Sequence, residues 1–430
     1  MPPSLLERSD LTVLLVGGGG REHAFATRLV ESPRLDKLLV APGNAGTAGI
    51  TTNVPIDAED VDALVAYSVE SVVDFVVVGP EVPLAAGLAD RLDSAGVLAF
   101  GPTAAAARIE SSKWFAKELM REHGVPTAST RKFTDFQTAS DYILAQEPPI
   151  VVAADGLAAG KGVAVASNHD EALAALRERL GHGGPGVLVQ EYMTGQEISV
   201  FAFVDGERVS EMIAACDYKP VGDGNVGPNT GGMGSYSPPV ASLWNAEIES
   251  RVRDEIMEPV VAALATEGSP FRGILYAGLM LTSEGPKVVE FNCRLGDPEA
   301  QVVLPRLKSD LLGVLISVAL GDVPEASLEW DDRSHVAVVL ASEGYPGKYT
   351  TGYLIEGLDE MPADVTVFHA GTRLESDAVL TDGGRVLAAS ASGETLEVAR
   401  RRAYEGVSRI RFAGSFHRGD IALIQQARRA

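Results

Sequence analysis

A short polar segment carries side chains that can hold a metal ion and a phosphate. Glu290, Asn292 and Arg294 alternate with Phe291 and Cys293. In a strand of period two, the first three share one face while the other two point into a core. A carboxylate beside a side-chain carbonyl suits Mg²⁺, which takes oxygen ligands and usually bridges substrate phosphates, and Arg294 would neutralise a transferring phosphoryl or acyl group. The alternative is a solvated polar face at a strand end.

A second segment, 150–163, joins an apolar run of strand type to a loop of small residues that contains Lys161. Glycines let backbone N–H groups approach phosphate oxygens, and a lysine adds positive charge. The loop is not a P-loop. In a pattern that starts at Gly156, the lysine comes one place early and is followed by Gly162 instead of serine or threonine. The segment predicts either a phosphate cradle of another fold or a β-hairpin with a glycine turn.

Four glycines at 17–20 occupy the first expected strand-to-helix turn, the usual place of a dinucleotide fingerprint. The GxGxxG spacing fails, because Glu22 or His23 stands where the third glycine belongs. The turn still offers N–H groups and a positive helix end to an anion, with Arg21 beside it, so we expect a sugar phosphate here. A glycine turn without a ligand is the alternative, and an NAD-dependent oxidoreductase is disfavoured.

A glycine-rich loop at 227–234 begins with an ordered Pro-Asn-Thr sequence that includes Asn229 and Thr230. Its amide and hydroxyl groups, combined with backbone freedom, suit a site that surrounds a small polar substrate. A plain flexible loop would be equally rich in glycine.

The first hundred residues contain the elements that must position these motifs. We expect strands at 11–16, 37–41, 72–78 and 97–100, and helices at 21–30, 58–68 and 84–94. This alternation predicts a parallel α/β sheet, and such sheets bind ligands at the carboxyl ends of their strands. The loops at 17–20, 42–47, 79–83 and 101–102 all follow strand ends.

The rest of the chain divides into a larger unit, a smaller inserted unit and a C-terminal lobe. A helix at 111–122 precedes the inserted unit, about 125–192, which contains the loop at 150–163. We then expect strands at 197–204, 208–215, 273–281, 287–292, 336–341 and 385–390, and helices at 244–265 and 394–407. Six glycines between 222 and 234 are too many for a packed element, and from about His335 a separate small lobe is expected.

Length and composition restrict the class of protein. A chain of 430 residues is too long for one ordinary core. No apolar run approaches the roughly 18 residues of a membrane helix, and the first ten residues lack a secretory signal. A net charge of −23 argues against a nucleic-acid or membrane surface, although a small phosphate-bearing substrate needs only local cations. Cys216 and Cys293 are too few for a disulfide framework, so we expect buried thiols and a cytoplasmic protein.

Eight motifs follow one another along nearly the whole chain. They are GGGGREHA (17–24), PGNAGT (42–47), DGLAAGKGV (155–163), GPNTGGMG (227–234), EFNCRLGDPE (290–299), LASEGYPGKYTTG (340–352), FHAGT (368–372) and GGRVL (383–387). Together they closely resemble the phosphoribosylamine-glycine ligases, also called glycinamide ribonucleotide synthetases, which are ATP-grasp enzymes of purine biosynthesis. This combination is far more specific than any single glycine loop.

The resemblance implies a fold and three domains. It implies an α/β protein with an N-terminal parallel sheet lobe, an ATP-grasp core with a small flap subdomain, and a small C-terminal α+β lobe. The expected boundaries are 1–110 for the phosphoribosyl lobe, 111–330 for the ATP-grasp domain with its flap at about 125–192, and 331–430 for the C-terminal lobe. The oligomeric state is not indicated, and a monomer is compatible with the sequence.

The resemblance also implies a reaction: ATP phosphorylates glycine, and the amine of 5-phosphoribosylamine attacks the resulting acyl phosphate. No protein nucleophile is needed, because positioning and charge neutralisation do most of the work in phosphoryl transfer. The expected cofactors are ATP and Mg²⁺, with Mn²⁺ as a possible substitute.

By resemblance, each part of the site has its own residues. The metal ligands are Glu290 and Asn292, and the reacting centre is lined by Arg294, Asp297 and Glu299. ATP would contact Lys113, Asp155, Gly156, Gly160, Lys161, Gly162, Gln190, Glu191 and Glu197. The substrates would contact Gly18, Gly19, Gly20, Arg21, Glu22, His23, Asn44, Asn229, Thr230, Gly231, Gly232 and Met233.

The chain departs from the family pattern at several positions. Ala153 stands where members usually carry a second ATP-binding lysine, and Tyr218, Pro220 and Asn225 replace the usual histidine, arginine and acid. Ala422 ends a motif that usually ends in glycine. Two alternatives to an active ligase follow: a weakened homologue that binds a ribosyl phosphate or a partner, and an ATP-grasp ligase with another acid or amine.

Overall fold

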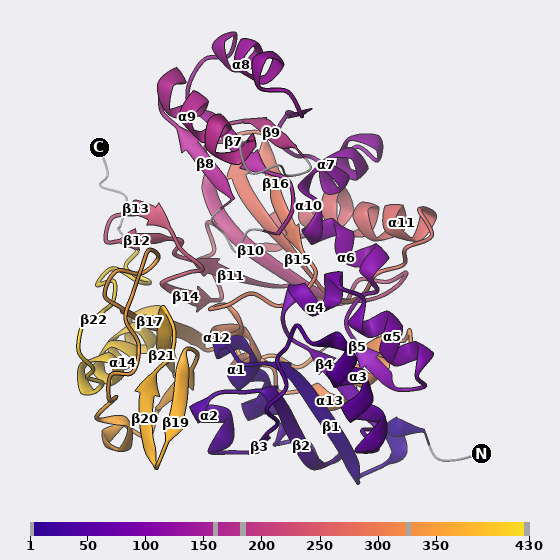
Figure 1. The fold of residues 1–430 in the computed structure, drawn as a ribbon, viewed down its shortest axis with the longest axis vertical. Helices are drawn as coiled ribbons and strands as arrows, with labels where there is room; N and C mark the ends of the chain where they lie inside the picture. The colour runs from indigo at the N-terminus through magenta and orange to yellow at the C-terminus, as the bar shows by residue number, and fades with distance from the viewer. Residues whose placement is uncertain (1–3, 158–161, 181–185, 324–327, 425–430) are drawn as a thin grey trace.

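The computed structural model describes residues 4–157, 162–180, 186–323 and 328–424. In Figure 1 the N-terminal lobe lies at the bottom, the unit built from residues 130–191 at the top, and the C-terminal strands at the left. The strand that carries the predicted metal ligands, Gly285–Asn292, runs between these three parts. The arrangement therefore brings the motifs of all three parts toward the middle of the molecule.

The N-terminal lobe is the predicted parallel α/β sheet. Its strands are β1 (Leu11–Gly17), β2 (Leu35–Pro42), β3 (Thr52–Asn53), β4 (Phe75–Val78) and β5 (Leu98–Phe100), in the order β3-β2-β1-β4-β5. Its helices are α1 (Gly20–Leu29), α2 (Ala45–Ala48), α3 (Val61–Glu70), α4 (Glu81–Ala85) and α5 (Leu88–Ser94). The single helix predicted at 84–94 is wrong, because Gly87 divides it with a φ of +82°, a left-handed conformation that glycine adopts without steric cost.

Strand β1 shows why the sheet of this lobe could be predicted from its sequence. Leu14 and Val16 pack into one apolar cluster, while Val13 and Leu15 pack into another on the opposite face. A strand covered on both faces needs a continuous apolar run instead of an alternating one. The run at 11–16 therefore identified a buried parallel strand.

The unit inserted after the N-terminal lobe is a four-stranded sheet covered by two helices. Its elements are β6 (Thr130–Phe133), α8 (Phe136–Leu144), β7 (Ile150–Ala154), β8 (Val163–Ala166), α9 (His169–Leu180) and β9 (Val187–Glu191), with strand order β6-β9-β7-β8. Strands β7 and β8 pair antiparallel, so the segment 150–163 is the first half of a β-hairpin. Residues 158–161 lie outside the described part of the chain.

A nine-stranded sheet forms the centre of the molecule and continues into the C-terminal region. Its strands are β10 (Gln196–Asp205), β11 (Ile213–Asp217), β14 (Gly234–Ser237), β15 (Arg272–Thr282), β16 (Gly285–Asn292), β17 (Ser334–Ser342), β18 (Val365–His369), β21 (Arg385–Gly393) and β22 (Ser415–Phe416). Strand β17 pairs with β14, which joins the C-terminal strands to the central ones. The same sheet therefore serves both regions.

Two predictions about this region need correction. The strand expected at 208–215 begins only at Ile213, because Asp205 accepts hydrogen bonds from the backbone of Glu207 and Arg208 and holds a turn there. The glycine-rich stretch from 222 to 234 does contain strands, since β12 (Pro220–Gly222) pairs with β13 (Val226–Asn229). Strand β13 is exposed along its whole length, which is why glycines are tolerated in it. A second small hairpin joins β19 (Thr372–Glu375) to β20 (Ala378–Thr381).

The remaining helices surround the central sheet. They are α6 (Ala104–Ser111), α7 (Lys113–Glu122), α10 (Ala246–Val252), α11 (Glu258–Thr266), α12 (Ala300–Val303), α13 (Leu311–Ala319) and α14 (Leu396–Arg409), with 3₁₀ turns at Leu5–Glu7, Leu304–Arg306 and Leu358–Glu360. The long helix predicted at 244–265 is interrupted by a π-helical turn at Arg253–Met257 between α10 and α11. In the described part of the chain, no helix has the length and apolar character needed to span a membrane.

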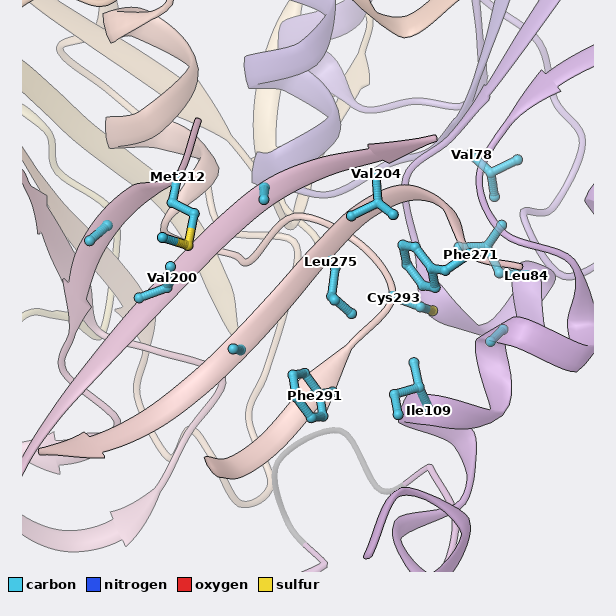
Figure 2. Packing of buried hydrophobic residues seen from close by; sticks show 14 of the residues in the cluster. Val78, Leu84, Ile109, Val200, Val204, Met212, Phe271, Leu275, Phe291 and Cys293 are labelled. Atoms are coloured by element: carbon cyan, nitrogen blue, oxygen red, sulfur yellow. The ribbon is translucent and has the colours of Figure 1, made fainter. Parts of the chain in front are cut away.

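The N-terminal lobe and the central sheet share one apolar core. Figure 2 shows Val78 and Leu84 of the lobe and Ile109 of α6 beside Phe271 and Cys293. Phe271 is completely buried. Because this core crosses the boundary between the two regions, it holds the N-terminal sheet in a fixed position against strand β16.

Replacing Phe271 tests this shared core. We expect Phe271→Ala to lower the free energy of unfolding by about 3–5 kcal/mol, the usual cost of removing a buried phenyl ring. Urea unfolding followed by fluorescence measures the change. The matched control is Leu374→Ala on β19, where the side chain is 52% exposed. A loss for Phe271→Ala no greater than that of the control would contradict a common core.

Candidate active site

A cavity of about 420 Å³ lies where the inserted unit, the central sheet and the N-terminal lobe meet. The predicted site residues that line it from the nucleotide side are Lys113, Gly162, Gln190, Glu191 and Glu197. Those from the metal and reaction side are Glu290, Asn292, Arg294, Asp297 and Glu299, joined by Arg21, Asn229, Thr230 and Gly231. The structure thus brings together residues from most of the motifs.

Strand β16 presents the predicted metal ligands to this cavity. Glu290 lies opposite Gly278 and Asn292 opposite Tyr276 on β15, while Phe291 and Cys293 are buried in the apolar core. Burial by itself would raise the pKa of Glu290, but neighbouring ammonium groups, led by that of Lys219, lower it below its usual value. An ionised carboxylate and an amide oxygen on one wall are a donor set that fits Mg²⁺, which completes its shell with water and phosphate.

Lys219 is a site residue that the sequence did not identify. Its ammonium lies 3.2 Å from Glu197 and 4.0 Å from Glu290. Burial opposes its charge, yet the pKa of Lys219 is raised because Glu197 and other anionic groups surround it. The lysine therefore pairs with Glu197 and lowers the pKa of Glu290.

Arg294 is held between two carboxylates from distant parts of the chain. It donates to Glu81 at 3.0 Å and to Glu110 at 2.9 Å, and more weakly to Asn292 at 3.4 Å. Burial raises the pKa of Glu110 although Arg294 opposes this effect, whereas the pKa of Glu81 falls to about 2 because the charges of Arg294 and Arg21 outweigh its burial. Neither glutamate belongs to one of the recognised motifs, so this cluster could not be predicted from the sequence.

The residues predicted to line the reacting centre form a hydrogen-bonded network of acids and their partners. Glu299 accepts hydrogen bonds from Tyr276 at 2.9 Å and Ser199 at 3.0 Å. Asp297 lies 3.3 Å from the guanidinium of Arg385 and accepts a hydrogen bond from Gln301 at 2.9 Å. Burial would raise the pKa of Asp297, but the charge of Arg385 holds it below the usual value.

Asp217, on β11, also lines the cavity and was not predicted. Burial raises its pKa, and the nearby negative charge of Glu299 raises it further. One of its carboxylate oxygens, Oδ1, has no hydrogen-bond partner among the described residues. A cationic or N–H-bearing substrate group would satisfy this oxygen.

On the nucleotide side, the start of α7 anchors the predicted loop. Lys113 donates to the carbonyl of Gly156 at 3.3 Å, and Asp155 accepts from the backbone N–H of Trp114 at 3.2 Å. Lys117, one turn further along α7, lines the cavity and was missed by sequence reasoning. Burial lowers its pKa to about 8. Asp155 itself is buried and does not line the cavity, and Gly160 and Lys161 lie outside the described residues.

The glycines of the first turn do not line the cavity, and of the predicted residues near this turn only Arg21, in α1, does. Gly19 donates its N–H to Glu22 at 2.7 Å, and a side chain added at Gly19 or Gly20 would collide with Glu22 or Gln301 and crowd Asp297. Gly18 accepts a hydrogen bond from Asn44 at 2.9 Å, so these two residues contact each other. His23 is buried against His369.

The segment 229–233, which begins at the last residue of β13, lines the cavity only with its first three residues. Asn229, Thr230 and Gly231 line the cavity, whereas Gly232 and Met233 do not. Met233 is completely buried, so its side chain is not accessible to a substrate in this structure. Gly232 has a φ of +111°, and a side chain there would collide with Pro298 and Asp217.

Tyr218, Pro220 and Asn225, which differ from the family pattern, form one cluster around the buried Arg418. Arg418 donates to the carbonyl of Pro220 at 2.8 Å and to the side chain of Asn225 at 2.9 Å, and it lies over the ring of Tyr218 at 5.0 Å. Ala422 donates its N–H to the hydroxyl of Tyr218. None of these residues is among those that line the cavity, so their changes affect a neighbouring packing cluster directly and the substrate pocket only through it.

The small antiparallel unit placed over a central sheet, with a cavity between them, defines an ATP-grasp protein. Profiles of the phosphoribosylglycinamide synthetase N domain, ATP-grasp domain and C domain match residues 11–110, 111–300 and 335–424. The chain belongs to the phosphoribosylglycinamide synthetase family, and membership implies ATP and a divalent metal ion.

Individual relatives agree with this assignment. The phosphoribosylamine-glycine ligase of Halalkalibacterium halodurans is 47% identical over 98% of both chains, and that of Salmonella typhimurium is 46% identical over 96% of this chain and 98% of its own. The crystal structure of the Thermotoga maritima ligase has a TM-score of 0.82 at 32% identity, covering 96% of this chain and 100% of its own. A biotin carboxylase domain from Hydrogenobacter thermophilus, solved with MgADP, has a TM-score of 0.72 over 94% of this chain and 91% of its own, but its 15% identity shows the fold alone.

The paired histidines beside the glycine turn predict how stability depends on pH. His369 donates its backbone N–H to Nδ1 of His23 at 2.8 Å, which requires His23 to be neutral. Burial lowers the pKa of His23 to about 3 and that of His369 to about 4, both below the unfolded value of about 6.5. The stabilisation is therefore complete above about pH 6.5 and is lost as the pH falls toward 4, because only the unfolded chain binds the protons.

Urea unfolding between pH 6.5 and 4.5 measures this effect. We expect His23→Gln to reduce the slope of unfolding free energy against pH by up to about 1.4 kcal/mol per pH unit, the contribution of one proton. The control is His123→Gln, at an exposed position, which should keep the slope of the wild type. Equal slopes for His23→Gln and the wild type would contradict the assignment.

Proposed function

We propose that this chain is an ATP-dependent ligase that joins glycine to 5-phosphoribosylamine and releases glycinamide ribonucleotide, ADP and phosphate in purine biosynthesis. The observation that carries the proposal is that residues from three predicted sites line the same cavity. Lys113 and Gln190 lie on one side, Glu290 and Asn292 on another, and Asn229 on a third. A nucleotide, its metal ion and a small polar substrate would meet there. Family membership over nearly the whole chain supports the same reaction.

The proposed roles follow from the position of each group. Gln190, Glu191 and Glu197 would bind the adenosine part of ATP, and Lys113 would bind its phosphates. Glu290 and Asn292 would hold Mg²⁺, or Mn²⁺ in its place, which when bound neutralises phosphate charge and orients the oxygens. Arg294, Asp297 and Glu299 would line the reacting centre and fix the positions of the substrates.

The reaction needs two reactants held close together in a site that excludes water. The glycine carboxylate attacks the terminal phosphate of ATP with ADP as the leaving group, and the ribosylamine nitrogen then displaces phosphate from the acyl carbon. Positioning supplies most of the rate in such reactions, and fixed charges stabilise the developing negative charge. The unpartnered oxygen of Asp217 suits the ammonium group of glycine, and Arg21 lies where the ribosyl phosphate would enter beside the glycine turn.

We further propose the working division of the chain. Residues 1–110 would bind the phosphoribosyl group through Gly18 to His23 and Asn44, residues 111–330 would bind ATP beneath a flap at about 125–192, and residues 331–430 would complete the site with Arg385. The buried free thiols of Cys216 and Cys293 suit a reducing compartment, so we place the reaction in the cytoplasm.

The overall reaction is tested by ADP release from the purified protein. We expect ADP only when ATP, Mg²⁺, glycine and ribosylamine are all present, with glycinamide ribonucleotide formed in equal amount. ADP formation that does not depend on glycine would overturn the proposal. A screen of other amino acids separates this ligase from one with a different acid.

The metal ligands are tested by Glu290→Gln, which removes the charge and keeps the shape. We expect turnover at saturating ATP and Mg²⁺ to fall by about a hundredfold or more, because a lost anionic ligand weakens charge neutralisation by a few kcal/mol. The matched control is Glu284→Gln, at the exposed turn that joins β15 to β16, which should retain activity. Full activity in Glu290→Gln would remove this residue from the metal site.

A further inference from the structure

Lys132 lies in the same row of the flap sheet as Ala153. Lys132 on β6 pairs with Leu188 on β9, and Leu188 pairs on its other side with Ala153 on β7. The three residues therefore form one line across three neighbouring strands. Ala153 is completely buried.

This row lies on the face of the sheet opposite the covering helices, the face from which Val151 and Gln190 line the cavity, although none of its three residues lines the cavity itself. Val152 and Val189 pack into the apolar core beneath α8 and α9. Val151 and Gln190, which point the other way, line the cavity. Side chains alternate along a strand, so Ala153 shares the face of Val151, and Lys132 shares it through the pairing with Leu188.

The lysine side chain reaches across the row toward Ala153. Strands lie about 4.8 Å apart, so the backbones of Lys132 and Ala153 are roughly 10 Å apart. The ammonium of Lys132 is nevertheless 2.9 Å from a carboxylate oxygen of Asp155, two residues after Ala153 on the same face. The path is open because Gly186 has no side chain: a Cβ there would lie 3.0 Å from Cε of Lys132.

Lys132 is not the only hydrogen-bond partner of Asp155. Asp155 also accepts hydrogen bonds from the hydroxyl of Ser112 and from the backbone N–H of Trp114 at the start of α7. Lys132 has three N–H donors, and among the described residues its one hydrogen bond goes to Asp155. Its side chain remains 24% exposed, so donors are available for a ligand.

We propose that Lys132 binds the phosphates of ATP and supplies, from β6, the ammonium group that Ala153 cannot supply from β7. The proposal rests on the proposed function, in which this cavity binds ATP. Lys113 contacts Gly156 and Lys132 contacts Asp155, so two ammonium groups converge on adjacent residues at the end of β7. On this proposal the cation has moved from β7 to β6, and the alanine at 153 does not indicate a weakened homologue.

Calorimetry on the full chain tests the proposal with ATP, ADP and adenosine as ligands, in the presence of Mg²⁺. We expect Lys132→Ala to raise the Kd for ATP and ADP by about ten- to a hundredfold, the range for one charge-assisted hydrogen bond. The affinity for adenosine should not change, because it has no phosphate. Lys132→Gln, which can still donate to Asp155, should show the same pattern and guards against a folding defect in the alanine variant.

An exchange of the two residues provides the decisive comparison. In Lys132→Ala combined with Ala153→Lys the lysine moves from β6 to β7 at constant net charge, and we expect ATP affinity to return toward that of the wild type. The matched control is Arg131→Met, on the opposite face of β6, where the guanidinium lies 4.9 Å from the ring of Tyr142. This variant should bind ATP normally.

Three results would overturn the proposal. They are unchanged ATP affinity in both Lys132 variants, an equal loss of affinity for ATP and adenosine, and an exchanged variant no better than Lys132→Ala. The second result would show that Lys132 only positions Asp155. Failure of the ligase proposal is separate, because it appears in the turnover of the wild type with glycine, whereas this test measures ATP binding without glycine or amine.

Discussion

The guanidinium of Arg294 lies between carboxylates from two other parts of the chain, and only 17% of its side chain is exposed. Glu81 comes from the N-terminal lobe and Glu110 from α6, while Arg294 itself follows the strand that carries Glu290 and Asn292. A buried charge is very costly unless it is paired and hydrogen-bonded. The pairing therefore couples three segments: each must be in place for the other two to be stable.

Pairing between carboxylates and nearby cations also explains how a strongly acidic protein can build a site for polyanions. The cavity wall contains many carboxylates, yet Lys219 stands between Glu197 and Glu290, and Arg385 holds Asp297. Local compensation lowers the pKa values of Glu290 and Asp297 although loss of contact with water opposes their charges. The phosphates and the metal ion would then meet a surface whose charges are already fixed in position, which is the condition for electrostatic stabilisation without reorganisation.

The sheet that carries the site also explains how the C-terminal region contributes to it. Strand β17 pairs with β14, which begins at Gly234, shortly after the segment 229–231, and β21 pairs with β17. Arg385, at the start of β21, donates to the carbonyl oxygens of Gly231 and Asp297. A residue more than 150 positions away from that segment thus becomes part of the same wall, through sheet pairing that has no local sequence signal.

Elements whose patterns are local could be predicted from the sequence. The apolar run at 11–16, the alternation around Glu290 and the glycine turns all follow from side-chain periodicity and backbone freedom, and the order of motifs identified the family. Tertiary structure alone decided the partners. Glu81, Glu110, Lys117, Asp217 and Lys219 reach the cavity through long-range packing, and the row that links Lys132 to Ala153 depends on strand pairing between residues far apart in the chain. The interruptions inside the helices predicted at 84–94 and 244–265 could not be predicted either. A left-handed Gly87 and a π-helical turn leave the helical periodicity of the sequence almost unchanged.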